Sequence, residues 1–145
     1  MSGETSFWGS YVDVHGKTDN IAYNVVVSGA YNNCYGGELD DKLTAKGWVV
    51  SLHGKSGNDT LIQNSYWAKT YGGKGDDTII ANQSGSFIYG EAGNDTITIN
   101  VSTSNEIDGG TGDDTYNINA SCAPKDTDGN NTVSYTHLRA HETRH

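Results

Sequence analysis

Five aspartates recur at a nearly constant spacing through the chain, each inside a glycine-rich turn. They are Asp41, Asp59, Asp77, Asp95 and Asp114. The steps between them are 18, 18, 18 and 19 residues, so a regular repeat would bring them close together in space. Neighbouring carboxylates repel each other, and a divalent cation between them relieves that repulsion. The spacing therefore indicates binding of a cation.

Each aspartate is the sixth residue of a turn that begins with a glycine, as in GGKGDDTI from Gly72 to Ile79. The starting glycines are Gly36, Gly54, Gly72, Gly90 and Gly109. Glycines at turn positions 1, 2 and 4 permit positive φ and let carbonyl oxygens point at one spot. A hard cation that takes several oxygen ligands in flexible geometry is calcium, whereas magnesium requires a stricter octahedron. The repeats contain no cluster of Cys and His that would favour zinc.

Three substitutions depart from this glycine pattern. Lys55 and Glu91 stand at turn position 2, and Leu39 stands at turn position 4. Leu39 weakens the expectation of a site between Asp41 and Asp59. Lys55 is compatible with a cation site only if its side chain points to solvent.

One repeat of 18 residues reads as turn, strand, turn, strand, and it leaves no room for a helix. Strands that recur in register pair with their copies about 4.8 Å away, which predicts a parallel solenoid. Alternation along the strand after Asp77 places Ile79 and Ala81 in the core, and Thr78 and Ile80 outside. Asparagines begin the second turn of several repeats and are interpreted as a structural ladder. These are Asn64, Asn82, Asn100 and Asn119.

The composition agrees with a thin core and a cationic partner. Only 34% of the residues are hydrophobic, and 18 acids against 9 bases give a formal net charge of −9. Such an acidic balance excludes general nucleic-acid binding, and no apolar run approaches the ~20 residues that a membrane span needs. The N-terminus lacks a basic start and an apolar signal core, so we expect export by another route or a piece of a longer protein.

The repeats divide the chain into three parts. Residues 1–17 are expected to cap the stack, and residues 18–133 to form the roll, with regular repeats over 36–116 and degenerate ends. Residues 134–145 break the pattern, resemble read-through tails that contain SYTHLRAHE, and are interpreted as foreign to the natural fold. Cys34 and Cys122 lie almost five repeats apart and are expected to be free thiols.

The recurring turns resemble the RTX, or haemolysin-type, calcium-binding nonapeptide GGxGxDxU. The resemblance implies an all-β, right-handed parallel β-roll in which calcium lies between adjacent coils, held by the sixth-position aspartates and by turn carbonyls. It implies about three to four ions, with Asp59, Asp77, Asp95 and Asp114 as the strongest ligands and Asp41 as a weaker one. Because only half of each coil carries the motif, we expect calcium turns along one edge.

Two further groups enter this expected calcium site. The glycines at turn position 1, which are Gly54, Gly72, Gly90 and Gly109, would contribute carbonyl ligands or tight geometry. The fifth-position acids Asp76 and Asp113 would shape the turn or donate carbonyl oxygens. A polar turn without any ion remains the alternative for all of these residues.

The function that the resemblance implies is a calcium-binding module of a secreted or cell-surface bacterial protein, which folds when calcium binds. The alternatives are an accessory roll of a secreted enzyme or toxin, and an adhesin-type surface that binds carbohydrate or ice. No GxSxG or HExxH motif is present, so we expect neither catalytic residues nor enzyme activity within this chain. Besides calcium, a carbohydrate or protein ligand and end-to-end stacking of rolls stay open as partners.

Overall fold

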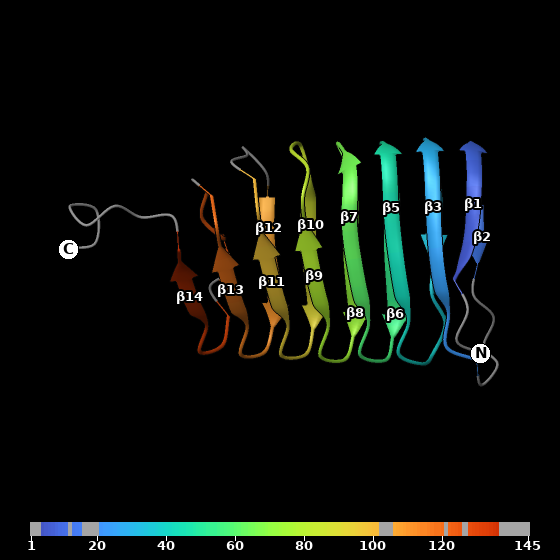
Figure 1. Ribbon diagram of the computed structural model, residues 1–145. Coiled ribbons are helices and arrows are strands. Elements are labelled where there is room, and N and C mark those ends of the chain that lie inside the picture. Colours follow the sequence, from blue (N-terminus) through green and yellow to red (C-terminus); the bar gives the residue numbers. More distant parts are fainter. Residues whose placement is uncertain are drawn as a thin grey trace.

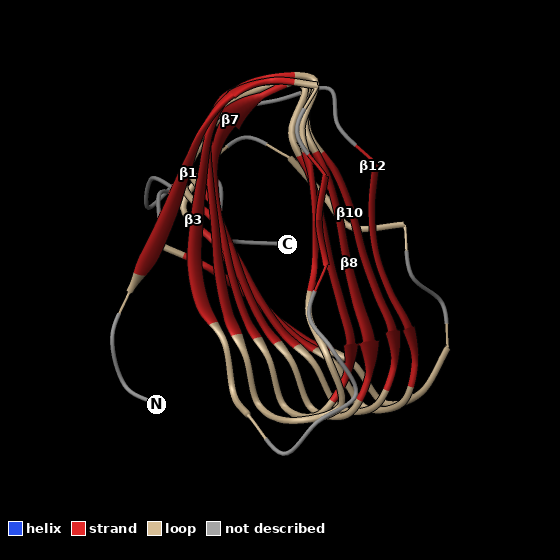
Figure 2. Cartoon of the chain, turned by 90° about the vertical axis from the view of Figure 1, so that its right-hand side faces the viewer, coloured by secondary structure: helices blue, strands red, loops and turns tan. Residues whose placement is uncertain are grey.

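Two parallel β-sheets face each other and form a solenoid (Figures 1 and 2). The computed structural model describes residues 4–11, 13–15, 21–101, 106–120, 122–125 and 128–136, and these contain no helix. The strands of the first sheet are, in spatial order, β1 (Thr5–Ser10), β3 (Asn24–Ala30), β5 (Lys42–Trp48), β7 (Thr60–Tyr66), β9 (Thr78–Ala81), β11 (Thr96–Ile99), β13 (Thr115–Ile118) and β14 (Thr132–Tyr135). Those of the second sheet are β2 (Asp13–His15), β4 (Asn33–Tyr35), β6 (Ser51–Ser56), β8 (Lys69–Lys74), β10 (Phe87–Ala92) and β12 (Glu106–Thr111).

The pairing register follows the sequence repeat. Thr60 lies beside Thr78, Thr78 beside Thr96, and Thr96 beside Thr115, so each step of the repeat moves the chain one strand along the sheet. This confirms the predicted parallel roll. Within the predicted N-terminal cap, β1 and β2 continue both sheets, with Thr5 beside Val25. Most of the tail after residue 133 lies outside the described residues, apart from the end of β14.

The core is a double row of inward side chains, as the strand alternation predicts. Ile79 and Ala81 are fully buried, whereas Thr78 and Ile80 on the same strand are only partly buried. The second sheet contributes a facing row that includes Leu52, Ile88 and Ile107. Sequence reasoning missed the polar members of these rows, such as Gln63 and Thr70. Only every second residue of a strand points into the narrow space between the two sheets. A low hydrophobic content is therefore sufficient to fill the core.

The asparagine ladder is confirmed. The Asn82 Nδ2 atom donates to Asn64 Oδ1, Asn100 Nδ2 donates to Asn82 Oδ1, and Asn119 Nδ2 donates to Asn100 Oδ1, all at 2.7 Å. Each amide therefore uses its donor toward one coil and its acceptor toward the next.

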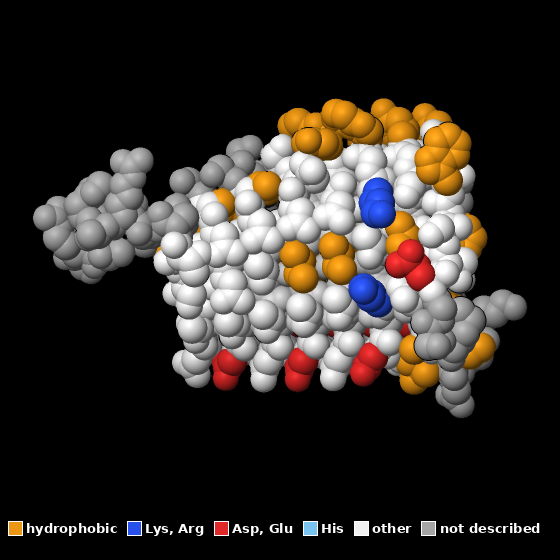
Figure 3. Space-filling model, in the orientation of Figure 1, with side chains coloured by type: hydrophobic (Ala, Val, Ile, Leu, Met, Phe, Trp, Pro, Cys, Tyr) orange, Lys and Arg blue, Asp and Glu red, His pale blue; other side chains and the backbone are white. Residues whose placement is uncertain are grey.

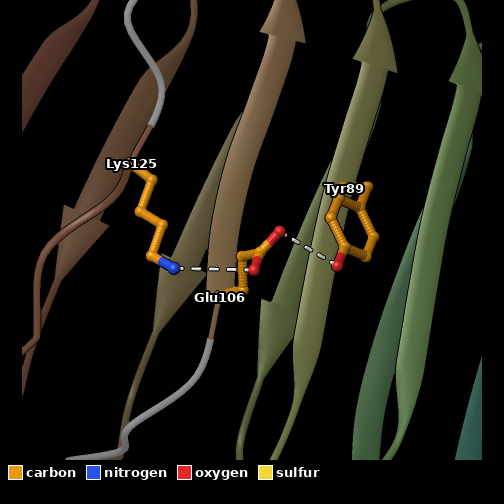
Figure 4. A network of polar contacts seen from close by, with 3 residues as sticks. All are labelled: Tyr89, Glu106 and Lys125. Carbon is orange, nitrogen blue, oxygen red and sulfur yellow. Dashed lines mark hydrogen bonds and ion pairs between the residues drawn. The ribbon is translucent and has the colours of Figure 1, made fainter.

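Aromatic and ionic contacts tie the coils together on the outer face of the second sheet. A column of stacked rings has centroid distances of 4.4, 4.5, 4.7 and 5.2 Å. Its members are His15, Tyr35, His53, Tyr71 and Tyr89. At its C-terminal end the Tyr89 hydroxyl donates to Glu106, which also pairs with Lys125 at 3.5 Å (Figure 4). Such stacked pairs each stabilise by about 0.5–1.5 kcal/mol beyond their burial.

Cys34 and Cys122 are both free, as predicted. Burial raises the pKa of the Cys34 thiol to about 12, so this side chain behaves as an apolar core residue. In the described part of the chain, no helix has the length and apolar character needed to span a membrane.

Candidate metal centre

The five recurring aspartates lie at one edge of the roll, where the chain passes from the second sheet into the first (Figure 1). Each immediately precedes a strand of the first sheet; Asp77, for example, stands just before β9. All five side chains are buried, with 3% or less of their surface exposed. Burial of an ionised carboxylate is costly unless a proton, a donor or a cation compensates it.

One oxygen of each carboxylate is used in a hydrogen-bonded ladder between coils. The N–H of Asp59 donates to Asp77 Oδ1 at 2.7 Å, and the N–H of Asp77 donates to Asp95 Oδ1 at 2.8 Å. The same contact joins Asp41 to Asp59 and Asp95 to Asp114. The predicted residues are thus brought together along one edge, and each acid contacts the coil before it.

The second oxygen lies inside a cradle formed by two glycines. Asp77 Oδ2 occupies the space where a Cβ of Gly72 would stand, and the carbonyl oxygen of Gly90 lies 2.6 Å from that same point. Asp59 has the same relation to Gly54 and Gly72, and Asp95 has it to Gly90 and Gly109. The Oδ2 atoms of Asp59, Asp77 and Asp95 are buried and receive no hydrogen bond within the described residues. A buried carboxylate oxygen without a donor requires a proton or a cation.

The electrostatics of these three acids agree with that requirement. Burial, and to a lesser degree the neighbouring carboxylates, raises the pKa of Asp59, Asp77 and Asp95 from 3.8 to about 7. The backbone hydrogen bond to Oδ1 lowers the pKa of each acid but does not cancel the effect of burial. Near neutral pH, these carboxyls are therefore partly protonated, and a bound cation would displace the proton.

A pH dependence with opposite signs follows for the calcium-free and calcium-saturated chain. Without metal, the three carboxyls bind protons more tightly when folded, so their stabilising contribution is complete below pH 4 and is lost as pH rises through about 7. We expect the calcium-free chain to have more β-structure and a higher Tm at pH 5 than at pH 8.

With saturating calcium, protons compete with the metal, so we expect stability to decrease as pH falls. Thermal unfolding followed by circular dichroism in both conditions checks this prediction. A calcium-free chain whose Tm rises from pH 5 to pH 8 would contradict it.

The first turn differs from the others. Asp41 Oδ2 accepts a hydrogen bond from the N–H of Gly37 at 2.6 Å, and Asp41 Oδ1 accepts one from Tyr23 at 2.7 Å. In the later turns the residue at turn position 2 has positive φ, with 80° at Lys55 and 113° at Gly73. Gly37 is not in this conformation, and its N–H therefore supplies the donor that the other carboxylates lack.

The last turn also differs, through Tyr116, a buried residue of β13. The Tyr116 hydroxyl lies 2.5 Å from the Cβ position of Gly109 and accepts the N–H of Gly109 at 2.6 Å. It therefore stands beside the Asp114 carboxylate. The other repeats have Leu or Ile at this eighth position, so the tyrosine was the sequence signal that this turn differs.

Asn131 extends the ladder of aspartate side chains by one coil. The N–H of Asp114 donates to Asn131 Oδ1 at 2.7 Å, in the same way that the other aspartates bond to their successors. The degenerate C-terminal end of the roll therefore retains the contact between coils while replacing the charge with an amide. Neutral asparagine is compatible with the ladder.

The fifth-position residues form a second ladder on the surface. The N–H of Asp76 donates to Asn58 Oδ1 at 2.8 Å, and Asp76 Oδ1 accepts the N–H of Asn94 at 2.9 Å. Asp113 is placed in the same way, between Asn94 and Asn130. The structure thus places Asp76 and Asp113 in an exposed row, apart from the buried carboxylates.

The side chain of Lys55 points away from the carboxylate edge. It is exposed, and its Nζ lies 5.7 Å from the ring centroid of Tyr35. Lys55 and Glu91 both have φ of 80°, so they accept the conformation that glycine takes at this turn position elsewhere. Neither residue blocks a cradle.

The donor set suits calcium. Among the described residues, no three His, Cys, Asp or Glu side chains gather closely enough to hold a metal by themselves. Any ion here would therefore take one or two carboxylates together with main-chain carbonyls. Oxygen ligands of these two kinds, in an adaptable geometry, are what calcium prefers.

Comparison with known protein families gives an independent indication. The family model for the RTX calcium-binding nonapeptide repeat matches residues 71–98 and 102–117, in four copies. The match includes the turns that begin at Gly72, Gly90 and Gly109. No curated protein and no solved structure matches the chain.

Proposed function

We propose that this chain, whose residues 71–98 and 102–117 match the RTX calcium-binding nonapeptide repeat, is a calcium-binding β-roll module that folds on calcium binding as part of a secreted or cell-surface bacterial protein. The observation that supports this most strongly is the repeated cradle. In three successive turns, a buried carboxylate oxygen without a donor faces a glycine carbonyl of the next coil.

Three equivalent sites follow from this arrangement. The ligands would be Asp59, Asp77 and Asp95, with main-chain oxygens of Gly72, Gly90 and Gly109, while Gly54 would leave room for the Asp59 carboxylate. The turn of Asp41 already has a donor for each carboxylate oxygen, and Asp114 has the Tyr116 hydroxyl beside it. We therefore infer three ions of similar affinity rather than four.

Calcium would supply positive charge at the edge, and the chain would supply the ligands, the space for them and the spacing of the coils. The carboxylates hold the ion, the glycines leave room for them, and the ladder fixes the spacing of the coils. Without the ion, deprotonated acids would be buried at a cost that a narrow core cannot offset. Binding to the folded state alone adds its free energy to folding.

Secretion is supported by the expected affinity. Extracellular calcium modules bind in the range of about 10⁻⁴–10⁻³ M, which suits an ion held mainly by carbonyls and few carboxylates. The chain would then remain unfolded inside the cell and fold after export. Among the residues that the structure describes, neither spacing nor geometry nominates a catalytic group.

The test is a calcium titration of the full chain, starting in chelator at pH 8 and followed by circular dichroism. We expect a cooperative gain of β signal between micromolar and millimolar calcium, and no comparable gain with magnesium. Isothermal titration calorimetry should give close to three ions per chain. A chain that is already folded in chelator at pH 8 and unmoved by calcium would refute the proposal.

A further inference from the structure

The edge of the roll opposite the acidic turns carries a row of exposed aromatic side chains, here called the aromatic ridge (Figure 3). The ridge consists of Trp8, Tyr11, Tyr31, Trp48, Tyr66 and Trp67. The exposed fractions of these residues are 86%, 78%, 53%, 55%, 37% and 60%, respectively. Contiguous apolar surface of this kind marks an interaction site in soluble proteins.

Burial alone does not explain why these aromatics are present. Tyr11, Tyr31 and Trp67 have φ of 60°, 57° and 56°, a left-handed conformation that bulky residues rarely take. One coil after Trp67, Gly85 takes the same place with φ of 80°. A side chain in this conformation costs on the order of 1–3 kcal/mol. Stacking of Tyr11 on Tyr31, with a centroid distance of 5.2 Å, offsets part of this cost, whereas the exposed rings gain little from burial.

A groove of about 440 Å³ opens beside the ridge at its N-terminal end. Trp8 and Trp48 line it as its large side chains, and Gly29, Gly47 and Ala30 form a floor with almost no side chain. Its polar groups are the hydroxyls of Ser10 and Ser28 and the amine of Lys46. No acid lines it, although the chain has a net charge of −9.

The groove coincides with a gap in an aromatic stack. Across the strands, Ser10 lies beside Ala30, Ala30 beside Trp48, and Trp48 beside Tyr66. The Trp48 ring stacks on Tyr66 with a centroid distance of 4.8 Å. On its other side the next two strands carry the small residues Ala30 and Ser10 at this register position, and the groove opens there. Because strands are about 4.8 Å apart, that space accommodates one ring stacked on Trp48.

We propose that this groove binds a pyranose ring of a polysaccharide, stacked on the free face of Trp48. A sugar ring has an apolar face that suits the indole and a rim of hydroxyls that suits Ser10, Ser28 and Lys46. A purely apolar occupant would leave these polar groups without partners, and a nucleic acid would be repelled by the acidic chain. Trp8 would contact the adjacent sugar or the outer edge of the ring.

Affinity electrophoresis in native gels with calcium tests the proposal on the full chain. The probes are dextran and hydroxyethyl cellulose as neutral polysaccharides and hyaluronan as an acidic one. We expect at least one of them to retard the protein by half or more of its mobility. Retardation by hyaluronan alone that is lost in Lys46→Gln would identify an acidic sugar, whereas retardation by the neutral probes would identify a neutral one.

Three surface variants separate the groove from general stickiness. Trp48→Ala removes the platform and should abolish retardation. Ala30→Tyr adds an aromatic ring but fills the gap in the stack, so it should abolish retardation as well. Phe87→Ala removes an apolar side chain of 37% exposure on β10, away from the groove, and should leave retardation unchanged.

Two results would overturn the proposal. The first is an absence of retardation by all three probes, or retardation that Ala30→Tyr does not change. The second is a dimer of the calcium-loaded protein in light scattering that Trp48→Ala dissolves, because the ridge would then be covered by a second copy.

Discussion

Replacing Asp59, Asp77 and Asp95 together by asparagine should produce a roll that folds in chelator at pH 8 and no longer responds to calcium. The substitution keeps Oδ1, so the ladder contacts at 2.7–2.8 Å from Asp41, Asp59 and Asp77 remain available. It replaces Oδ2 with an amide nitrogen, which can donate to the glycine carbonyl in each cradle. Asn131 already performs the ladder function at the end of the roll.

The expected size of this effect follows from the raised pKa values. A buried carboxyl with a pKa of about 7 rather than 3.8 costs up to about 4 kcal/mol when deprotonated, and the variant removes this cost three times. Solvent near the edge makes the real gain smaller. We expect the β signal of the variant in chelator to approach that of the calcium-loaded wild type. Its calcium midpoint should rise at least tenfold, or the transition should disappear.

The chain offers a matched control on the neighbouring positions. Replacing Asp40, Asp76 and Asp113 by asparagine changes the net charge equally, but these side chains are exposed and alternate with Asn58 and Asn94 in the surface ladder. This control should keep its calcium-dependent folding, with a midpoint within about threefold of wild type. If both triple variants behave alike, the buried carboxylates do not have the role assigned to them.

Gly72→Ala should prevent the roll from folding around its central coils at any calcium concentration. The added methyl group would overlap Asp77 Oδ2 and would stand 2.6 Å from the Gly90 carbonyl oxygen, a backbone atom that cannot easily move. Overpacking commonly costs about 1–3 kcal/mol, and a backbone clash lies at the upper end. Because each coil contacts only its neighbours, the damage reaches both adjacent cradles.

Lys74→Ala is the control for this variant, because it changes an exposed side chain of the same turn. Circular dichroism at saturating calcium should show wild-type β signal for Lys74→Ala and a loss of roughly half or more for Gly72→Ala. A normal calcium midpoint and Tm for Gly72→Ala would show that the first glycine of the turn is not part of a tight cradle.

Much of this architecture could be predicted from the sequence because the repeat is short and regular. An 18-residue step fixes which residues lie side by side, so the pairing of Thr60, Thr78 and Thr96 and the burial of Ile79 follow directly. The recurrence of aspartate at one turn position also located the acidic edge. These inferences depend only on the period and on strand alternation.

Other features depend on contacts that no period encodes. The inward orientation of the carboxylates is decided by space above the first glycine, which becomes visible only when the turns are stacked. The Tyr116 hydroxyl beside Asp114 and the Gly37 donor to Asp41 arise from single substitutions at the two ends of the array. Strand β1 pairs with β3 at an offset of 20 residues without any turn motif, so the repeat gave no signal for it.

The two side-chain ladders at the acidic edge make the N-terminal and C-terminal ends of the roll chemically different. In the buried ladder, each aspartate N–H finds its acceptor in the coil that follows, as Asp77 does with Asp95. In the surface ladder the acceptor lies in the coil that precedes, as Asn58 is for Asp76. A coil added at the C-terminal end therefore supplies a buried acceptor, whereas one added at the N-terminal end supplies a buried donor. The two ends of such a stack are chemically distinct, and in the coil after Asp114 the acceptor is the uncharged side chain of Asn131.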